Sequence, residues 1–230
     1  MYINMEDNIL KNDTKIIGKK TFKELHDDFN VSKQLVKNKL MNRQFQGGDM
    51  ICFGYDKFYD KIFDSLRNKP LIYLEIGILQ GLKMFIFSKF LTKALFYGID
   101  INIDNFNNYP HDNEFKKRVK DISLVNTNNK KSTDSYKNKI KVKYDIIIDD
   151  GDHNPLSMIN TFNSFYEKLN DSGIYIIEDV RKPSRLKKVS KFFNKKGIKY
   201  EFMIDPTQFE RFDAKEKGNG IIVIYKKDNL

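Results

Sequence analysis

The stretch LIYLEIGILQG, residues 71–81, decides the fold. Its first six residues form an apolar run of strand length, and Gly77 and Gly81 follow in a turn that leads into a helical segment over Met84–Leu91. A strand, a glycine turn and a helix in this order indicate one unit of an α/β sheet. A nearly continuous apolar strand is typical of one that is buried on both faces.

The same alternation continues to the end of the chain. Further strands are expected over 94–99, 122–125, 144–148, 174–177, 200–204 and 220–225, and helices over 134–139, 155–169 and 184–197. One face of the helix that begins at Pro155 should carry Leu156, Ile159, Phe162, Phe165 and Leu169. The last two strands have no helix between them. The pattern predicts an α/β, Rossmann-like sheet that is mainly parallel and has an antiparallel C-terminal edge strand.

Residues 1–70 are expected to form a helical N-terminal extension to a domain that spans 71–230. Thr21 and Ser32 can cap two short helices, and residues 55–67 read as an amphipathic helix with Phe58, Ile62, Phe63 and Leu66 on one side. The segment 21–40 also resembles a helix-turn-helix with lysines available for phosphates, which is the basis of an alternative function in nucleic-acid binding or modification. The preferred interpretation is that these helices cover the rim of the active site or mediate dimerisation.

Carboxylates follow the predicted strands at the same end. In open α/β sheets, ligands bind beyond the carboxyl ends of the strands. The residues found there are Glu75, Asp100, Asp149-Asp150 and Glu178-Asp179. Their convergence on one rim predicts the functional site.

The glycine turn and Asp100 predict a nucleoside cofactor. Gly77 lets the backbone approach a ligand closely, and Asp100, 23 residues later, can accept hydrogen bonds from ribose hydroxyls. The third glycine of a dinucleotide fingerprint and the Gly-Lys-Ser/Thr phosphate loop are both missing from the sequence. A cofactor with a ribose but no pyrophosphate fits best, which favours S-adenosylmethionine (SAM) over NAD. Tight turns also need glycine for purely structural reasons.

A cation site and a general base are predicted beside the cofactor. Asp150, Glu178 and Asp179 can hold Mg²⁺, which prefers oxygen ligands, and His153 can accept a proton from a hydroxyl. The alternatives are that Asp149 or Asp150 caps the next helix, that Glu178-Asp179 faces solvent and that His153 is a surface residue.

Four segments resemble one enzyme family, the metal-dependent sugar O-methyltransferases of macrolide biosynthesis. They are Leu74–Ile78, Tyr97–Ile101, Asp149–His153 and Ile174–Asp179, and the similarity extends over roughly 48–226. The chain departs from the family at Asp152, where serine is usual, and in the segments 48–50 and 180–182. Related enzymes act on glycans, so the resemblance implies a sugar-like small molecule or glycan as the methyl acceptor.

The resemblance also implies roles for individual residues. SAM is expected around Glu75, Gly77, Gly81 and Asp100, and Asp149 is counted with these cofactor-binding residues. Mg²⁺ is expected on Asp150, Glu178 and Asp179. The catalytic residues are expected to be His153, as general base, and Asp150. The implied fold is that of the class I methyltransferases.

Composition limits the remaining possibilities. The chain has 230 residues, of which 40% are hydrophobic and 13% aromatic, so global disorder is not expected. No apolar run approaches the length that spans a bilayer, and one cysteine cannot form an internal disulfide. A cytoplasmic protein without a membrane partner is expected, and a homo-oligomer is possible. The net charge of +10 either attracts a polyanion or reflects a bias spread over the surface.

Overall fold

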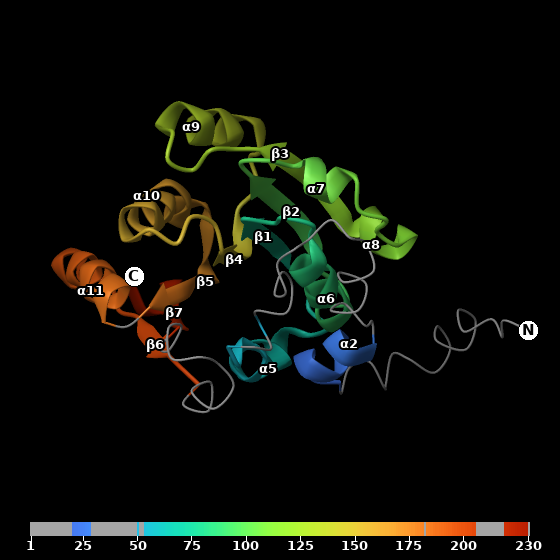
Figure 1. Ribbon diagram of the computed structural model, residues 1–230, viewed down its shortest axis with the longest axis horizontal. Helices are drawn as coiled ribbons and strands as arrows, with labels where there is room; N and C mark the ends of the chain where they lie inside the picture. Colours follow the sequence, from blue (N-terminus) through green and yellow to red (C-terminus); the bar gives the residue numbers. More distant parts are fainter. Residues whose placement is uncertain (1–19, 29–49, 51–52, 182, 206–218, 230) are drawn as a thin grey trace, which may run out of the picture.

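Seven strands form one sheet in the computed structural model, which describes residues 20–28, 50, 53–181, 183–205 and 219–229. The strands are β1 (Ile72–Ile76), β2 (Leu95–Asp100), β3 (Val119–Leu124), β4 (Tyr144–Asp149), β5 (Leu169–Arg181), β6 (Glu201–Met203) and β7 (Asn219–Tyr225). Their order in the sheet is β3-β2-β1-β4-β5-β7-β6 (Figure 1). The first five strands are parallel, and β7 runs antiparallel to both β5 and β6. The predicted mainly parallel sheet with an antiparallel C-terminal edge is confirmed.

Helices cover both faces of this sheet (Figure 1). The α-helices are α2 (Phe22–Asp28), α5 (Tyr55–Phe63), α6 (Leu82–Phe90), α7 (Asp104–Asn107), α8 (Asn113–Arg118), α9 (Lys130–Lys139), α10 (Pro155–Phe165) and α11 (Ser184–Lys196). Short 3₁₀ turns are η2 (Asp64–Leu66), η3 (Tyr166–Lys168) and η5 (Lys226–Asn229). Asn154 caps α10 by accepting from Leu156 N–H, and Pro155 occupies its first turn as expected.

The alternation of side chains along the central strands creates two separate cores. In β5, Ile174 and Ile176 point to one face, whereas Tyr175 and Ile177 point to the other. The first core is shared with α2, α5 and α6, and the second with α9, α10 and α11. Because both faces are covered, the central strands are apolar at nearly every position, which is why residues 72–76 and 146–148 lack polar alternation.

Three local predictions were wrong. Leu156 does not belong to the buried face of α10, because it lies in the first turn of that helix with 65% of its surface exposed. Leu169 begins β5 instead of ending α10. The strand expected over 174–177 does not stop before Glu178; β5 continues to Arg181 through a shift in its pairing with β7. The short helices α7 and α8 lie in a region where the sequence shows no clear periodicity.

The helices before the sheet pack onto it. Phe22 of α2 is fully buried, its ring stacks on Phe90 at 3.9 Å, and its N–H donates to Asp60 of α5. The apolar side of α2, the first helix of the helix-turn-helix alternative, thus faces the sheet domain. The second helix of that alternative lies outside the described residues. The boundary between residues 70 and 71 stays a prediction.

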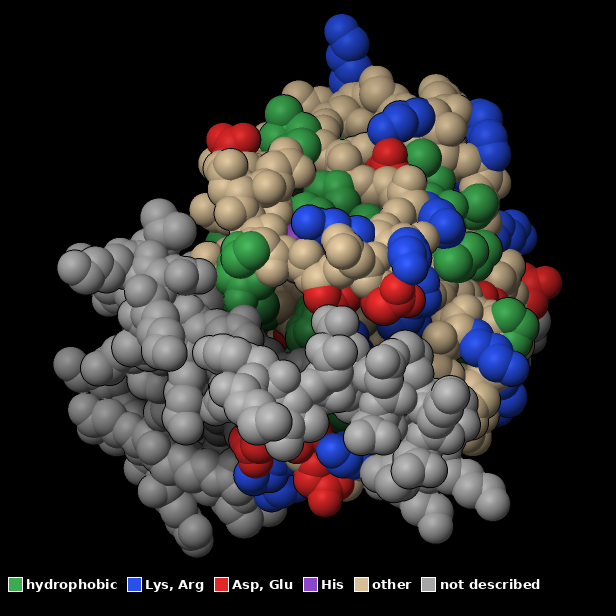
Figure 2. Space-filling view, turned by 90° about the vertical axis from the view of Figure 1, so that its right-hand side faces the viewer, with side chains coloured by type: hydrophobic (Ala, Val, Ile, Leu, Met, Phe, Trp, Pro, Cys, Tyr) green, Lys and Arg blue, Asp and Glu red, His purple; other side chains and the backbone are tan. Residues whose placement is uncertain are grey.

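The basic charge is dispersed on the face that Figure 2 shows, where Lys and Arg side chains are spread over the surface with Asp and Glu between them. This pattern agrees with the interpretation of the +10 net charge as a general bias. Among the described helices, none combines the length and the apolar character needed to cross a membrane.

Candidate functional site

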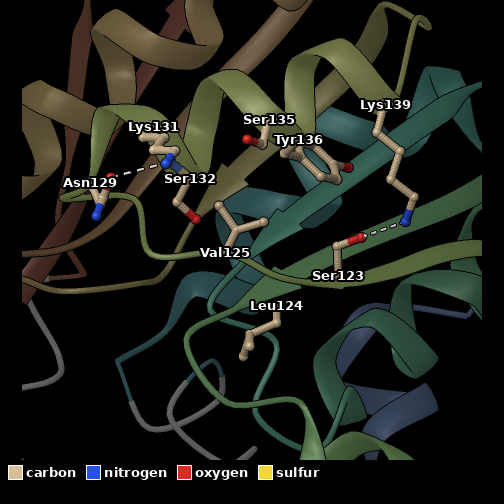
Figure 3. Close-up of a pocket in the computed structure, with 9 residues that line it drawn as sticks. All are labelled: Ser123, Leu124, Val125, Asn129, Lys131, Ser132, Ser135, Tyr136 and Lys139. Atoms are coloured by element: carbon tan, nitrogen blue, oxygen red, sulfur yellow. Dashed lines mark hydrogen bonds between the residues drawn. The ribbon is translucent and has the colours of Figure 1, made fainter.

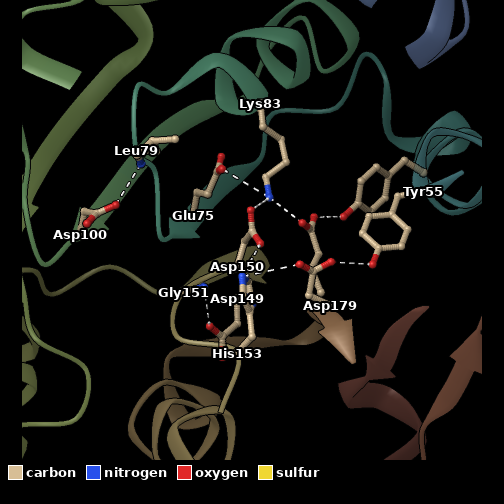
Figure 4. Close-up of polar contacts among 12 residues, drawn as sticks. Tyr55, Glu75, Leu79, Lys83, Asp100, Asp149, Asp150, Gly151, His153 and Asp179 are labelled. Carbon is tan, nitrogen blue, oxygen red and sulfur yellow. Dashed lines mark hydrogen bonds and ion pairs between the residues drawn. The ribbon is translucent and has the colours of Figure 1, made fainter. Parts of the chain in front are cut away.

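The predicted carboxylates lie together at the carboxyl edge of the sheet (Figure 4). Backbone hydrogen bonds fasten the loops that carry them: Asp150 N–H donates to Ile76 C=O (2.9 Å) and Gly77 N–H to Ile99 C=O (2.8 Å). Glu75 and Asp149 are buried within the last residues of their strands, and Asp150 is half-buried just beyond β4. The topology therefore assembles residues that are separated by up to about a hundred positions in the chain.

The turn after β1 is built around Gly77. Its φ is +85°, and a Cβ at this position would lie 2.2 Å from the carbonyl oxygen of Asp150. The next loop residues connect the turn to β2, because Leu79 N–H donates to Asp100 Oδ2 at 2.9 Å and Asn102 N–H donates to Asp100 Oδ1 at 3.0 Å. Leu79 itself has a φ of +49°, which is uncommon for a branched residue. Asp100 is thus held in place between two backbone donors.

Gly81 has a clear packing reason to be glycine. It precedes α6 with a φ of +73°, and a Cβ there would lie 2.5 Å from the ring of Phe106. His111 packs its ring against Phe106 at 4.4 Å, and burial lowers its pKa to about 4. A direct contact between Gly81 and the cofactor stays a prediction.

Lys83, a residue that the sequence analysis missed, lies at the centre of the carboxylates. It comes from the first turn of α6, and its Nζ lies 2.6 Å from Asp150 Oδ2, 2.7 Å from Glu178 Oε2 and 3.6 Å from Glu75 Oε1 (Figure 4). Only 10% of its side chain is exposed. One sequence signal could have indicated this position: Lys83 stands near the start of a helix that is otherwise largely apolar, directly after the glycine turn.

Glu178 and Asp179 occupy the irregular part of β5. The pairing with β7 shifts between Ile177 and Val180, and Asp179 has a φ of +55°. A bulge of this kind re-aims side chains, and a left-handed non-glycine residue is a strained arrangement that is common at functional sites. Asp179 is thereby turned to the rim, where Tyr55 donates a hydrogen bond to its Oδ1 at 2.8 Å. Tyr59, one turn further along α5, donates to Glu178 Oε1.

Three side chains form the group best placed to hold a metal ion. Asp150, His153 and Asp179 each offer one ligand atom, and these atoms lie within 4.8 Å of one another. His153 Nε2 is 3.6 Å from Asp179 Oδ2 and 4.0 Å from Asp150 Oδ1. About a third of the His153 side chain is exposed (34%), so a bound molecule can reach the imidazole. Glu178, predicted as a ligand, instead contacts Lys83 and Tyr59.

Burial perturbs the acids beneath the rim. It raises the pKa of Glu75 to about 8, against the opposing effect of Lys83, and it also raises the pKa of Glu178. Burial alone would lower the pKa of Lys83, but Asp150 and Glu178 outweigh it and hold that pKa well above its ordinary value. The ammonium therefore stays charged, and the buried acids remain short of positive charge.

Asp149 provides a stability test, because burial raises its pKa to about 8 from an ordinary value of 3.8. Its Oδ1 accepts from Gly151 N–H at 3.3 Å, while Oδ2 has no hydrogen-bond partner within the described part of the chain. The folded state prefers the protonated form of Asp149. Protonated Asp149 therefore makes its full contribution to folding stability below pH 3.8, and this contribution is lost as the pH rises toward 8. We expect Asp149→Asn, which cannot ionise, to be more stable by ~2 kcal/mol or more at pH 8.

Melting temperatures of both proteins between pH 4 and 9, measured in EDTA, would check this. The difference in melting temperature between Asp149→Asn and wild type should increase with pH. Asp152→Asn is the matched control from the same loop: the hydrogen bond from Ser157 lowers the pKa of Asp152, so this variant should lose stability relative to wild type as the pH rises from acid to neutral. Parallel curves for Asp149→Asn and wild type would contradict the ionisation of a buried Asp149.

A small cavity of about 90 Å³ opens between the glycine turn and the carboxylates. The residues that line it are Met50, Glu75, Gly77, Ile78, Leu79, Gln80, Leu82, Lys83, Asp150 and Glu178. The Oε1 atom of Gln80, one of these lining residues, is buried and has no hydrogen-bond partner among the residues that the structure describes. Buried amide oxygens are nearly always paired, so the cavity has an acceptor ready for a polar ligand.

A larger hollow of about 540 Å³ lies between edge strand β3 and α9 (Figure 3). Its polar side chains bond one another: Lys139 Nζ donates to Ser123 Oγ at 3.0 Å, and Ser132 N–H donates to Asn129 Oδ1 at 3.2 Å. The predicted site residues all lie outside this hollow. The carboxylate rim is therefore the better candidate for chemistry.

Comparison with known proteins supports the resemblance predicted from the sequence. The chain is 24% identical over 153 residues to mycinamicin VI 2''-O-methyltransferase of Micromonospora griseorubida, covering 62% of this chain and 35% of that protein. It is 24% identical over 134 residues to 8-demethyl-8-alpha-L-rhamnosyl tetracenomycin-C 2'-O-methyltransferase of Streptomyces olivaceus, covering 55% and 33%. The chain thus spans about a third of the length of these curated relatives. No protein-family model matches it.

Solved structures confirm the fold. The methyltransferase MycE of the mycinamycin pathway, crystallised with Mg and S-adenosylhomocysteine (SAH), superposes with a TM-score of 0.56 at 16% identity, covering 85% of this chain and 53% of that one. An O-methyltransferase from Bacillus cereus in complex with SAH gives a TM-score of 0.52 at 14% identity, with coverages of 86% and 90%. The sheet is that of the Rossmann-like class I methyltransferases.

Proposed function

We propose that this chain is a SAM-dependent O-methyltransferase that uses Mg²⁺ and acts on a hydroxyl of a sugar-like small molecule or glycan. The observation that carries the proposal is the grouping of Asp150, His153 and Asp179 within 4.8 Å, beside the turn that joins Gly77 to Asp100. A cofactor-binding turn, a set of hard ligands and an accessible base are the parts that such a transfer needs. The names of the sequence relatives support a sugar hydroxyl as the acceptor.

The residues around Asp100 fit the nucleoside part of SAM. Asp100 would accept the ribose hydroxyls, and two apolar side chains beside it are unusually exposed, Ile101 by 68% and Leu124 by 64%. The strands hold them together, since Asp100 is paired with Leu124 and accepts Val125 N–H at its carbonyl (2.7 Å). Apolar side chains at a polar rim favour a flat, weakly polar ligand such as adenine.

A conservative change tests this assignment. Ile101→Ala should weaken the binding of SAH by about fivefold, because it removes most of the apolar surface that an adenine ring would cover. Isothermal titration of wild type and variant measures the change. The melting temperature of the free variant should match wild type, because the side chain is largely exposed. Unchanged SAH affinity would mean that the adenine ring does not contact Ile101.

The ligands at the rim fit Mg²⁺ in their chemistry. Asp150 and Asp179 offer carboxylate oxygens, which this ion prefers, and His153 lies beside them. The buried acids add to the need for positive charge, since among the described residues Lys83 is the one ammonium placed between Glu75, Asp150 and Glu178. A divalent cation bound there would lower the pKa of an acceptor hydroxyl.

The protein's own groups would then position the acceptor and move its proton. In this mechanism the two carboxylates would hold the ion, and His153 would stay outside the ligand set and accept the hydroxyl proton. Asp179 stays fixed by the hydrogen bond from Tyr55. No protein nucleophile is required, because the cofactor supplies an electrophilic methyl group. Most of the rate would come from the alignment of acceptor and cofactor over the carboxyl ends of β4 and β5.

The first experiment is isothermal titration of the purified protein with SAH, in EDTA and in Mg²⁺. Micromolar binding supports the cofactor assignment and leads to a screen of sugar and glycan acceptors with labelled SAM. Absence of binding in both buffers would overturn the proposed function.

A further inference from the structure

Lys83 occupies the position where a metal ion would otherwise neutralise the buried acids. Its Nζ contacts Asp150 Oδ2 and Glu178 Oε2 at hydrogen-bonding distance, and Glu75 lies slightly further away. The aliphatic part of the side chain is enclosed, because α6 delivers it from within the first core. An ammonium with two carboxylate partners inside the protein is a strong, fixed counter-charge.

The two oxygens of Asp150 face different partners. Oδ2 accepts from Lys83 at 2.6 Å, whereas Oδ1 is the atom nearer His153, at 4.0 Å. A divalent cation that binds Asp150 therefore shares this carboxylate with an ammonium. The ammonium repels the incoming cation and withdraws negative charge from its ligand.

Glu178 is removed from the ligand group by the same lysine. Its Oε2 accepts from Lys83 at 2.7 Å and its Oε1 accepts from Tyr59, so both oxygens are occupied. The side chain is almost fully buried. For Glu178 to reach a metal ion at the rim, the contact with Lys83 has to break.

We propose that Lys83 is a built-in cation that holds Asp150 and Glu178 in the metal-free protein and competes with the divalent cation for them. Lys83 thereby sets the metal affinity of the site and decides whether Glu178 becomes a ligand. The inference rests on the proposed function, because it assumes that the rim binds a divalent metal. It assigns to Lys83 a positioning role in addition to that function.

Mn²⁺ binding to the full chain tests the competition. Lys83→Met keeps the length and the apolar stem but removes the charge, and we expect it to bind Mn²⁺ about tenfold more tightly than wild type in isothermal titration. Lys89→Met is the matched control from the same helix, since Lys89 pairs with Asp112 at 2.8 Å away from the rim. Its affinity for Mn²⁺ should stay within about twofold of wild type.

Thermal melting gives a second measurement in case the loss of Lys83 weakens the fold. In EDTA, Lys83→Met should melt below wild type, because buried carboxylates lose their counter-charge. Saturating Mn²⁺ should raise its melting temperature by more than it raises that of wild type. If the methionine variant does not fold, Lys83→Gln is measured in the same way.

Two negative results can be told apart. Equal or weaker Mn²⁺ binding by the Lys83 variant, with wild type still binding, would overturn the competition and leave the proposed function intact. Absence of Mn²⁺ binding by every variant and by wild type would overturn the metal-dependent part of the proposed function together with this inference.

Discussion

Asp179→Ala should reduce methyl transfer by roughly 10³-fold or more while the protein still binds SAH. Asp179 is held at the rim by a left-handed backbone and by the Tyr55 hydroxyl, and it is the carboxylate nearer to His153. Its loss removes a proposed metal ligand and the anion that orients the base. The cofactor turn at Gly77 and Asp100 is made of other residues, so SAH affinity should change by less than about threefold.

Initial rates with a methyl acceptor and titration with SAH measure the two quantities. Asp171→Ala is the matched control, because Asp171 lies on the same strand at an exposed position and pairs only loosely with Lys226, at 3.3 Å. That variant should keep full activity. An active Asp179→Ala enzyme, whether EDTA is present or not, would rule out a metal role for this residue.

Gly77→Ala should have the largest effect on the fold around the cofactor. The backbone at Gly77 has a φ of +85°, and the new Cβ would meet the carbonyl of Asp150 at 2.2 Å and Gly151 Cα at 2.8 Å. These are backbone atoms, so the loop after β4 has to move. We expect a loss of ~3 kcal/mol or more in the free energy of unfolding, together with loss of SAH binding.

Gly197→Ala separates the two causes of this loss. Gly197 ends α11 with a φ of +68°, but a Cβ there would have no atom of the described residues within 4 Å. This variant should cost only the ~1 kcal/mol of a left-handed alanine, and SAH binding should be unchanged. Urea unfolding of both variants measures the difference. Equal losses in the free energy of unfolding would mean that the close approach of Gly77 to the loop after β4 does not contribute to the destabilisation.

The fold was predictable because its signals are local. Buried strands, the glycine turn at Gly77 and the cap and proline at the start of α10 each act within a few residues of sequence. The convergence of carboxylates at one rim followed from the parallel arrangement alone. The wrong placement of Leu156 has a local cause as well: the buried face of α10 begins with Ser157 and Met158 in the same turn, and Leu156 lies beside that face and not on it.

The interior of the site was not predictable, since its partners are distant in the chain. Lys83 contacts carboxylates 67 and 95 residues away, and Tyr55 contacts Asp179 across 124 residues. A lysine on a helix normally indicates a solvent-exposed position, and a tyrosine is as common in cores as in sites. The irregular path of β5 at Asp179 depends on its pairing with β7, which no motif in either segment indicates.

The position of β7 late in the sequence also affects the order in which parts of the site form during synthesis. Val180 of β5 pairs with Gly220, and the Asn219 side chain lies 3.5 Å from Asp179 Oδ1. During synthesis Asp179 emerges from the ribosome 40 residues before Asn219, the first residue of the partner strand β7. The nascent chain can therefore build the glycine turn at Gly77 early, whereas Glu178 and Asp179 take their final positions only when residues 219–225 have emerged and inserted beside β5.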